Sequence, residues 1–168
     1  MLATFKVISL FLSAVTMSTA LAHALEFPGK MRLNQSTYLA VQTIYYPGFT
    51  FAGIAEPLSA ISLLVLMFVH RATGASFWWL LTAFIAAISM HIVFWVVTQP
   101  INRHWLRDQY LNRAGAEFFG TNRKDNPTTE TNNPNQWEVL RRRWEYSHIA
   151  RGALAIFSFI SICIAVVR

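Results

Sequence analysis

Two residue pairs with a three-residue spacing mark places where this chain could do chemistry. His23 and Glu26 form one pair, and Glu145 and His148 form the other, so the members of each pair would share one face of a helix. A Glu-x-x-His pair on bundle helices is the pattern that holds two iron or manganese ions in di-metal carboxylate proteins. Glu145 and His148 follow that order, whereas His23 and Glu26 reverse it. Further ligands would therefore have to come from other helices.

Glu56 and His91 could supply those ligands, because both lie inside strongly apolar stretches. An ionisable side chain within a membrane is costly and is a functional hypothesis by default. Histidine acts as a base or as a metal ligand near neutral pH. A mixed imidazole and carboxylate set would suit iron, manganese or zinc, and a haem held by two of the histidines is a weaker variant. The candidate metal ligands are His23, Glu26, Glu56, His91, Glu145 and His148.

Each of these residues also has a purely structural interpretation. His23 and Glu26 would sit at a membrane boundary, where polar side chains are ordinary, and Glu145 could belong to a solvated helix end. Glu56 could simply pair with Arg151 inside the bundle, since a buried charge needs a partner. The sequence leaves both interpretations open.

The composition indicates lipid as the surroundings of these residues. Hydrophobic residues make up 54% of the 168 residues and charged residues only 13%, whereas a soluble domain carries about 25% charged residues. A helix needs about 20 mostly apolar residues to cross the hydrocarbon core. We therefore predict a single all-α membrane domain, an up-down four-helix bundle with helices at about 7–25, 46–69, 77–98 and 149–167 and a long polar loop at 99–147.

The first apolar stretch has a rival interpretation. Lys6, the apolar run after it and the small residues around Ala20 and Ala22 also resemble a signal peptide, which would be cleaved and leave three helices. We expect the segment to be retained as the first helix.

Two prolines and the polar segment refine the predicted boundaries. The second helix should begin near Pro47 and continue through a kink at Pro57. The third should end at Pro100, because the residue before a proline disfavours the helical region. In the polar segment, 104–119 could form an amphipathic surface helix and 120–136 a linker. A helical pattern over 137–147 could continue directly into the fourth helix.

Basic residues predict the orientation. The net charge is +6, and Lys and Arg accumulate on the cytoplasmic side of membrane helices. This places the polar loop in the cytoplasm and gives no reason to expect a nucleic acid partner. Cys163 is the single cysteine, so an intrachain disulfide is excluded. The basic residues of the loop are Arg103, Arg107, Arg113, Arg123, Lys124, Arg141, Arg142 and Arg143.

Short motifs along most of the chain are similar to those of a known family. The runs 23–30 and 41–49, Pro100-Ile-Asn102, and Trp144-x-x-x-His148-x-x-Arg151 resemble the anthrone-oxygenase-like group of small four-helix membrane proteins. The resemblance implies oxidation of anthrones to anthraquinones by O₂ without a known cofactor, and it adds weight to Asn102, Trp144 and Arg151. The histidine-bearing first motif is typical of bacterial members of unknown function, so a polyketide substrate is not carried over. A bacterial inner membrane is the expected location.

Together these features favour a membrane-embedded oxygenase or oxidoreductase with a site between the helices near the cytoplasmic leaflet. His91 or His148 would be base or ligand, Glu56 base or ligand, and Arg151 and Asn102 would orient an anionic or enolate form of a hydrophobic small molecule. The alternative is a non-catalytic accessory or scaffold subunit of a membrane complex. A small transporter is a third interpretation, and it is disfavoured because no inverted repeat is visible in the sequence.

Overall fold

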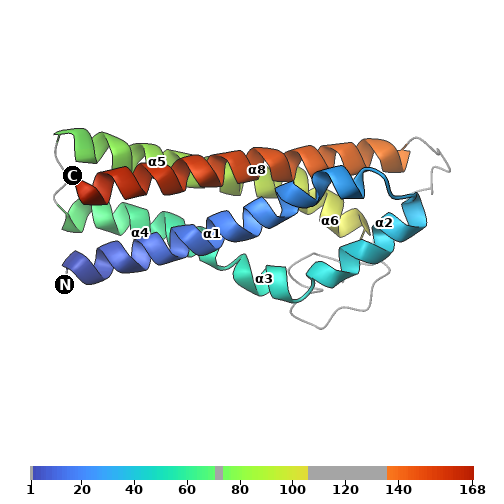
Figure 1. The fold of residues 1–168 in the computed structure, drawn as a ribbon, viewed down its shortest axis with the longest axis horizontal. Helices are drawn as coiled ribbons and strands as arrows, with labels where there is room; N and C mark the ends of the chain where they lie inside the picture. The colour runs from blue at the N-terminus through green and yellow to red at the C-terminus, as the bar shows by residue number, and fades with distance from the viewer. Residues whose placement is uncertain (1, 71–73, 106–135) are drawn as a thin grey trace.

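The computed structural model describes residues 2–70, 74–105 and 136–168, which form helices and short turns. Four long helices run along a common direction, and the start of the first and the end of the last lie at the same end of the bundle (Figure 1). The first packs against the second and fourth, and the third packs against both of these as well. The predicted all-α, up-down bundle is confirmed. The helices are α1 (Leu2–Lys30), α4 (Ala55–Val69), α5 (Gly74–Val93) and α8 (Gln136–Val167).

Four helical segments are long and apolar enough to cross a membrane: Leu2–Lys30, Gly48–Val69, Gly74–Trp105 and Gln136–Val167. Within the most apolar 18 residues of each segment, only 22% to 39% are buried inside the protein. The outward sides carry large apolar side chains such as Phe11 and Phe68, which are 65% and 75% exposed. So much exposed apolar surface is favourable in hydrocarbon and unfavourable in water. The chain is an integral membrane protein.

Small residues line the contacts between helices. Ser13 and Ser59 join α1 to α4 through a hydrogen bond of 3.0 Å, and Ser158 on α8 donates to the carbonyl of Ala83 on α5 at 2.8 Å. Membrane helices pack in this way because lipid provides no hydrophobic drive between helices, and close backbone approach must supply the attraction.

Gly152 provides a test of this close packing. A Cβ at Gly152 on α8 would lie 3.2 Å from the Cβ of Ala24 and 3.5 Å from the carbonyl oxygen of Ala20 on α1. We expect Gly152→Leu to reduce the free energy of unfolding by about 1–3 kcal/mol through overpacking. Gly29→Ala is the control, because a Cβ at Gly29 meets nothing within 4 Å. Unfolding of both variants in detergent micelles gives the comparison, and equal stability would contradict close α1–α8 packing.

The break in the second span lies before Pro57 rather than at it. The short helix α3 (Gly48–Ala52) ends just before Gly53, and α4 begins at Ala55. Pro57 is thus in the first turn of α4, where its missing N–H would have no helical partner in any case. The chain turns at Gly53 and Ile54 instead, and the N–H of Glu56 bonds to the carbonyl of Gly53 at 3.1 Å. This turn sets the direction from which Glu56 enters the bundle.

The prediction that the third helix ends at Pro100 is wrong. A π-helical turn, η2 (Phe94–Thr98), follows α5, and α6 (Gln99–Trp105) continues the helix beyond the proline. The wider π turn changes the hydrogen-bond register just before Pro100, so the helix tolerates the missing N–H. The continuation carries Asn102 and Trp105 alongside α8.

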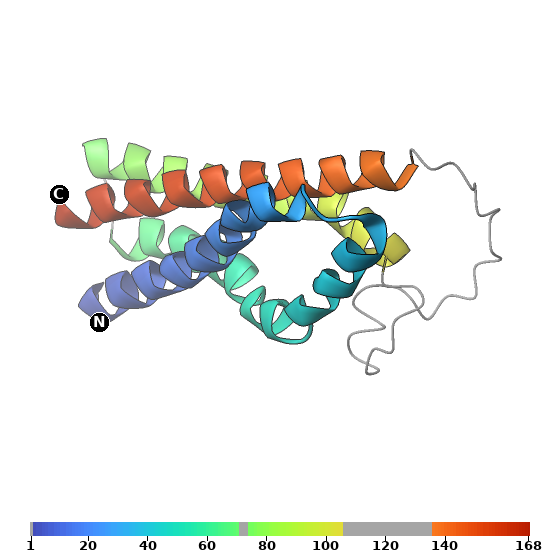
Figure 2. The ribbon, with the colours of Figure 1, turned by 45° about the vertical axis from the view of Figure 1, so that its right-hand side comes forward.

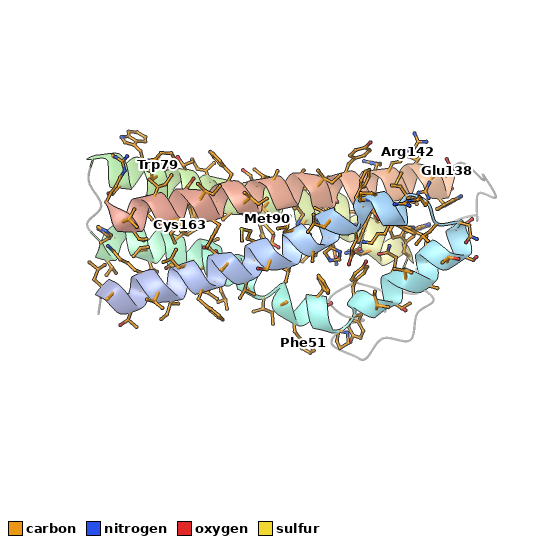
Figure 3. The ribbon with its side chains drawn as sticks, viewed as in Figure 1. Phe51, Trp79, Met90, Glu138, Arg142 and Cys163 are labelled. Carbon is orange, nitrogen blue, oxygen red and sulfur yellow. The ribbon has the colours of Figure 1, made fainter. Side chains whose placement is uncertain are left out.

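The fourth helix begins at Gln136, so residues 136–147 are helical and are not part of a loop. The continuation predicted for 137–147 is present. Glu138 and Arg142 pair at 3.9 Å near the start of α8, at the end of the molecule opposite Trp79 (Figure 3). The predicted surface helix at 104–119 and the linker at 120–136 fall almost entirely outside the described residues.

An arm beside the bundle connects α1 to α4. It consists of α2 (Gln35–Gln42), the 3₁₀ turn η1 (Thr43–Tyr45) and α3. Asn34 begins it by accepting a hydrogen bond from the N–H of Thr37, as N-cap residues do. The arm lies apart from the four long helices along part of its length (Figure 2). The space between arm and bundle is where the candidate site is found.

Candidate functional site

A cavity of about 330 Å³ opens between α1, the arm, the η2–α6 segment and α8. This volume falls at the lower end of the range of small-molecule pockets, about 300–1,000 Å³. Its accessible walls are mainly apolar and include seven aromatic side chains, but ten of the other lining residues are polar or charged. The aromatic lining residues are Tyr45, Tyr46, Phe49, Phe94, Trp95, Trp105 and Trp144.

Glu56 lies on the cavity wall at the centre of a buried charge cluster. Its Oε2 accepts a hydrogen bond of 2.6 Å from Arg151, and its Oε1 lies 3.2 Å from Nδ1 of His91. Glu56 is only 6% exposed. A buried carboxylate needs such partners, since an unpaired charge would be strongly unfavourable. The cluster joins α4, α5 and α8.

The hydrogen-bond direction at His91 follows from its second partner. The indole N–H of Trp95 donates to Nε2 of His91 at 2.9 Å. Because an indole can only donate, Nε2 must accept, and the proton of a neutral His91 ring is on Nδ1. His91 therefore donates to Glu56. Both of its nitrogen atoms are engaged, so it holds the carboxylate in place.

His148 is oriented in the same way by Arg151. Nη1 of Arg151 lies 3.4 Å from Nδ1 of His148. A guanidinium has no acceptor, so Nδ1 of His148 accepts and a neutral ring carries its proton on Nε2. That Nε2 is buried and has no hydrogen-bond partner among the described residues. The described structure thus leaves this N–H without an acceptor.

His23 contacts His148 across the cavity wall. The two ring centroids are 4.3 Å apart, and His23 also touches Tyr45 and Phe49 at 4.5 Å each. Nδ1 of His23 has no hydrogen-bond partner in the described structure, and the nearest carboxylate oxygen, Oε2 of Glu26, is 3.9 Å away. Two buried imidazoles in contact, each with an unpartnered nitrogen, therefore border the cavity.

Asn102 and Trp144 form a fixed part of the same wall. The indole N–H of Trp144 donates to Oδ1 of Asn102 at 2.7 Å. This bond settles the orientation of the amide and leaves its NH₂ group as a donor beside the cavity. The Trp144 ring in turn packs on His148 with centroids 4.1 Å apart.

A second polar cluster lies next to the cavity, toward the start of α8. Nζ of Lys30 is 2.9 Å from Glu26 and 3.9 Å from Glu145, and it sits over the rings of Tyr45 and Trp144. Tyr45 donates its hydroxyl hydrogen to Glu26. Burial, and then the hydrogen bond to Glu26, raises the pKa of Tyr45, so this side chain stays a phenol.

The four residues predicted as catalytic all border the cavity, namely Glu56, His91, Asn102 and Arg151. The six predicted metal ligands do not gather at one point. Glu56 pairs with His91, His23 stacks on His148, and Glu26 and Glu145 flank Lys30. Within residues 2–70, 74–105 and 136–168, no group of three or more His, Cys, Asp or Glu side chains could hold a metal ion.

Sequence reasoning missed several contributors. Trp95 follows His91 by four residues and Lys30 follows Glu26 by four, so helical spacing could have indicated both pairs. Tyr38 and Tyr45 had no such signal, because only the fold of the arm brings them to their carboxylates.

Comparison with known proteins adds one match. The sequence profile of the family described as Anthrone oxygenase matches residues 42–161, which is more than two thirds of the chain. The matched range includes Glu56, His91 and the Trp144-to-Arg151 segment and leaves out His23. No curated protein and no solved structure matches the chain.

Proposed function

This chain belongs to the anthrone oxygenase family, and on that premise we propose that it is a membrane-embedded oxygenase that oxidises a hydrophobic aromatic substrate with O₂. The observation that carries the proposal is the aromatic cavity with its buried pair of imidazoles, His23 and His148. Aromatic walls suit a polycyclic substrate, and the imidazole and amide groups among them could exchange a proton or donate a hydrogen bond at one position on it.

The proposed reaction converts a methylene between aromatic rings into a carbonyl. Loss of a proton from that carbon gives an enolate, which is electron-rich enough to react with O₂. One oxygen atom of O₂ becomes the carbonyl oxygen, and the other leaves with the two methylene hydrogens as one water molecule. The protein must therefore remove a proton, stabilise the enolate oxygen and keep bulk water away.

His23 is the proposed base. Nδ1 of His148 is occupied by Arg151 and both nitrogens of His91 are engaged, which leaves His23, whose Nδ1 has no hydrogen-bond partner in the described structure, as the better acceptor. Glu56 is a weaker candidate, because both of its carboxylate oxygens are already engaged, one by Arg151 and the other by His91. The NH₂ group of Asn102 is the proposed donor to the enolate oxygen. Arg151 and His91 act as positioning residues.

The charge distribution supports a cytoplasmic position of this half of the bundle. Described basic residues near the start of α8 and the end of α6 are Arg103, Arg141, Arg142 and Arg143, whereas Lys6 and Arg168 are at the opposite end. The positive-inside rule then puts the cavity in the leaflet nearer the cytoplasm, and a bacterial inner membrane fits this arrangement.

Purified protein in detergent, supplied with anthrone under air, tests the function directly. We expect anthraquinone to form with one O₂ consumed per molecule, faster than in a protein-free detergent control. Product can be measured by its absorption and O₂ with an electrode. A rate equal to the protein-free rate would overturn the proposal for this substrate class.

The metal hypothesis has a separate measurement on the same preparation. Iron, manganese or zinc in equal amount to the protein, lost in both Glu56→Ala and His91→Ala, would assign these two residues as ligands. A haem would show in the optical spectrum. In that case metal chemistry would replace the imidazole pair in the proposal.

A structural role in a larger membrane complex is the second candidate. The polar cluster of Glu26, Lys30, Glu145 and Tyr38 favours it, because these contacts join α1, the arm and α8 whether or not the cavity is used. Protein that fails to oxidise anthrone and copurifies with large membrane partners would favour this candidate.

A further inference from the structure

A row of aromatic rings leads from the cavity wall to the polar end of the bundle. Trp144 and Trp105 line the cavity with ring centroids 5.8 Å apart. Trp105 is 5.3 Å from Tyr38, and Tyr38 is 6.3 Å from Trp137. These four residues come from α8, α6 and α2, so the row exists only in the folded protein. Rings at such distances exchange electrons readily.

Tyr38 has the partner that an oxidisable tyrosine requires. Its side chain is fully buried, and its hydroxyl donates to Oε1 of the fully buried Glu145 at 2.8 Å. Burial, and then the charge of Glu145, raises the pKa of Tyr38, so the hydroxyl keeps its proton at physiological pH. Oε2 of Glu145 has no hydrogen-bond partner among the described residues, so this carboxylate can still take up a proton.

The charges near the row favour Tyr38 over Trp137 as its end point. The guanidinium of Arg141 lies over the Trp137 ring at 4.4 Å. Oxidation of Trp137 would leave a cation beside this guanidinium, and like charges repel. Lys30 lies 4.7 Å from the Trp144 ring, but Trp144 holds the charge only in passing, and Arg141 is farther from Tyr38, at 5.9 Å. Oxidation of Tyr38 produces a neutral radical, because its proton moves to Glu145.

We propose that Trp144, Trp105 and Tyr38 carry an oxidising equivalent out of the cavity, with Glu145 as the proton acceptor. The inference rests on the proposed function, which supplies the oxidant. When the enolate passes one electron to O₂, it gives superoxide and a substrate radical, and that radical adds a second O₂ to form an organic peroxyl radical. The peroxyl radical gains one electron and becomes a peroxide anion. Tyr38 loses that electron through Trp105 and Trp144, and its proton passes to Glu145. A peroxide anion, a tyrosyl radical and a neutral carboxylic acid result, so the total charge is unchanged.

The route would protect the side chains that touch the substrate. Trp144 packs on His148 at 4.1 Å, and an oxidising equivalent left on Trp144 would damage the cavity wall. Transfer to Tyr38 moves it away from the substrate.

Pulse radiolysis of the full-length protein in detergent tests the route. Azide radicals made in solution oxidise tryptophan, and tryptophanyl and tyrosyl radicals have separate absorption bands. A Trp137→Phe background removes the half-buried tryptophan at the outer end, so that Tyr38 is reached through Trp105. We expect tryptophanyl decay with matching first-order tyrosyl growth in this background. The growth should be lost on adding Tyr38→Phe or Trp105→Leu, and kept with the exposed control Tyr146→Phe.

Glu145→Gln separates the proton step from a folding defect, because it keeps the size and shape of the side chain. We expect this variant to keep the tryptophanyl signal and lose tyrosyl growth. The competing acceptor is Tyr45, which donates to Glu26 and lies 6.4 Å from Trp144. Tyrosyl growth that survives Tyr38→Phe and disappears in Tyr45→Phe would overturn the inference. Since the azide radical is made in solution, this outcome is independent of whether anthrone is oxidised.

Discussion

Glu56→Gln should lower the free energy of unfolding by about 3–5 kcal/mol, the usual loss when one partner of a buried ion pair is removed. Glu56 accepts from Arg151 at 2.6 Å and lies 3.2 Å from His91, and its side chain is only 7% exposed. A neutral amide keeps the volume but leaves the Arg151 charge uncompensated in the bundle. It also presents an NH₂ group to donors that need an acceptor. The defect should therefore be electrostatic rather than a cavity.

Glu138→Gln is the matched control for that result. Glu138 pairs with Arg142 at 3.9 Å, but these side chains are 44% and 62% exposed. Solvent screens such a pair, so its loss should change stability by about 0–1 kcal/mol. Unfolding of both variants by denaturing detergent, followed by circular dichroism, gives the comparison. Equal midpoints for the two variants would show that Glu56 is not the centre of the cluster.

His23→Phe should reduce the rate of anthrone oxidation about 10²–10⁴-fold, the usual contribution of a general base. A phenyl ring preserves the packing against Tyr45, Phe49 and His148 and removes the nitrogen that would accept the proton. Because the substitution keeps the aromatic wall, we expect substrate binding and protein stability to change little. The main effect should be on kcat.

His70→Phe is the control for the second prediction. His70 also has a buried nitrogen without a hydrogen-bond partner in the described structure, but it lies at the far end of α4, away from the cavity. Steady-state rates for the two variants should therefore differ widely. An unchanged rate in His23→Phe would exclude His23 as the base and leave Glu56 as the remaining candidate.

The two results together would separate the enzyme from the structural alternative. In a scaffold subunit, Glu56→Gln would still destabilise the bundle, since the ion pair holds the helices together in either case. His23→Phe would then have no rate to reduce. Only the enzyme hypothesis predicts a large effect from a substitution that leaves the fold intact.

The sequence by itself determined the class of the protein and the region of the site. Hydropathy identified the four spans because crossing hydrocarbon depends on the local run of apolar residues, which needs no tertiary information. The cost of a charge in lipid also depends on the local sequence, so it identifies Glu56 and His91 without tertiary information. The sequence further allows the pairing of Glu56 with Arg151 that the structure shows.

Tertiary structure decided how these residues are used. The turn at Gly53 and Ile54 before Pro57, and the continuation of the third helix past Pro100 through the π turn, are features that local propensity does not reveal. The six predicted metal ligands, three histidines and three glutamates, share one half of the bundle. Whether they form one metal site depends on how each helix is rotated about its axis, which spacing along the chain does not determine. The proton positions on His91 and His148 follow from Trp95 and Arg151, because hydrogen-bond direction is a property of contacts made across the fold.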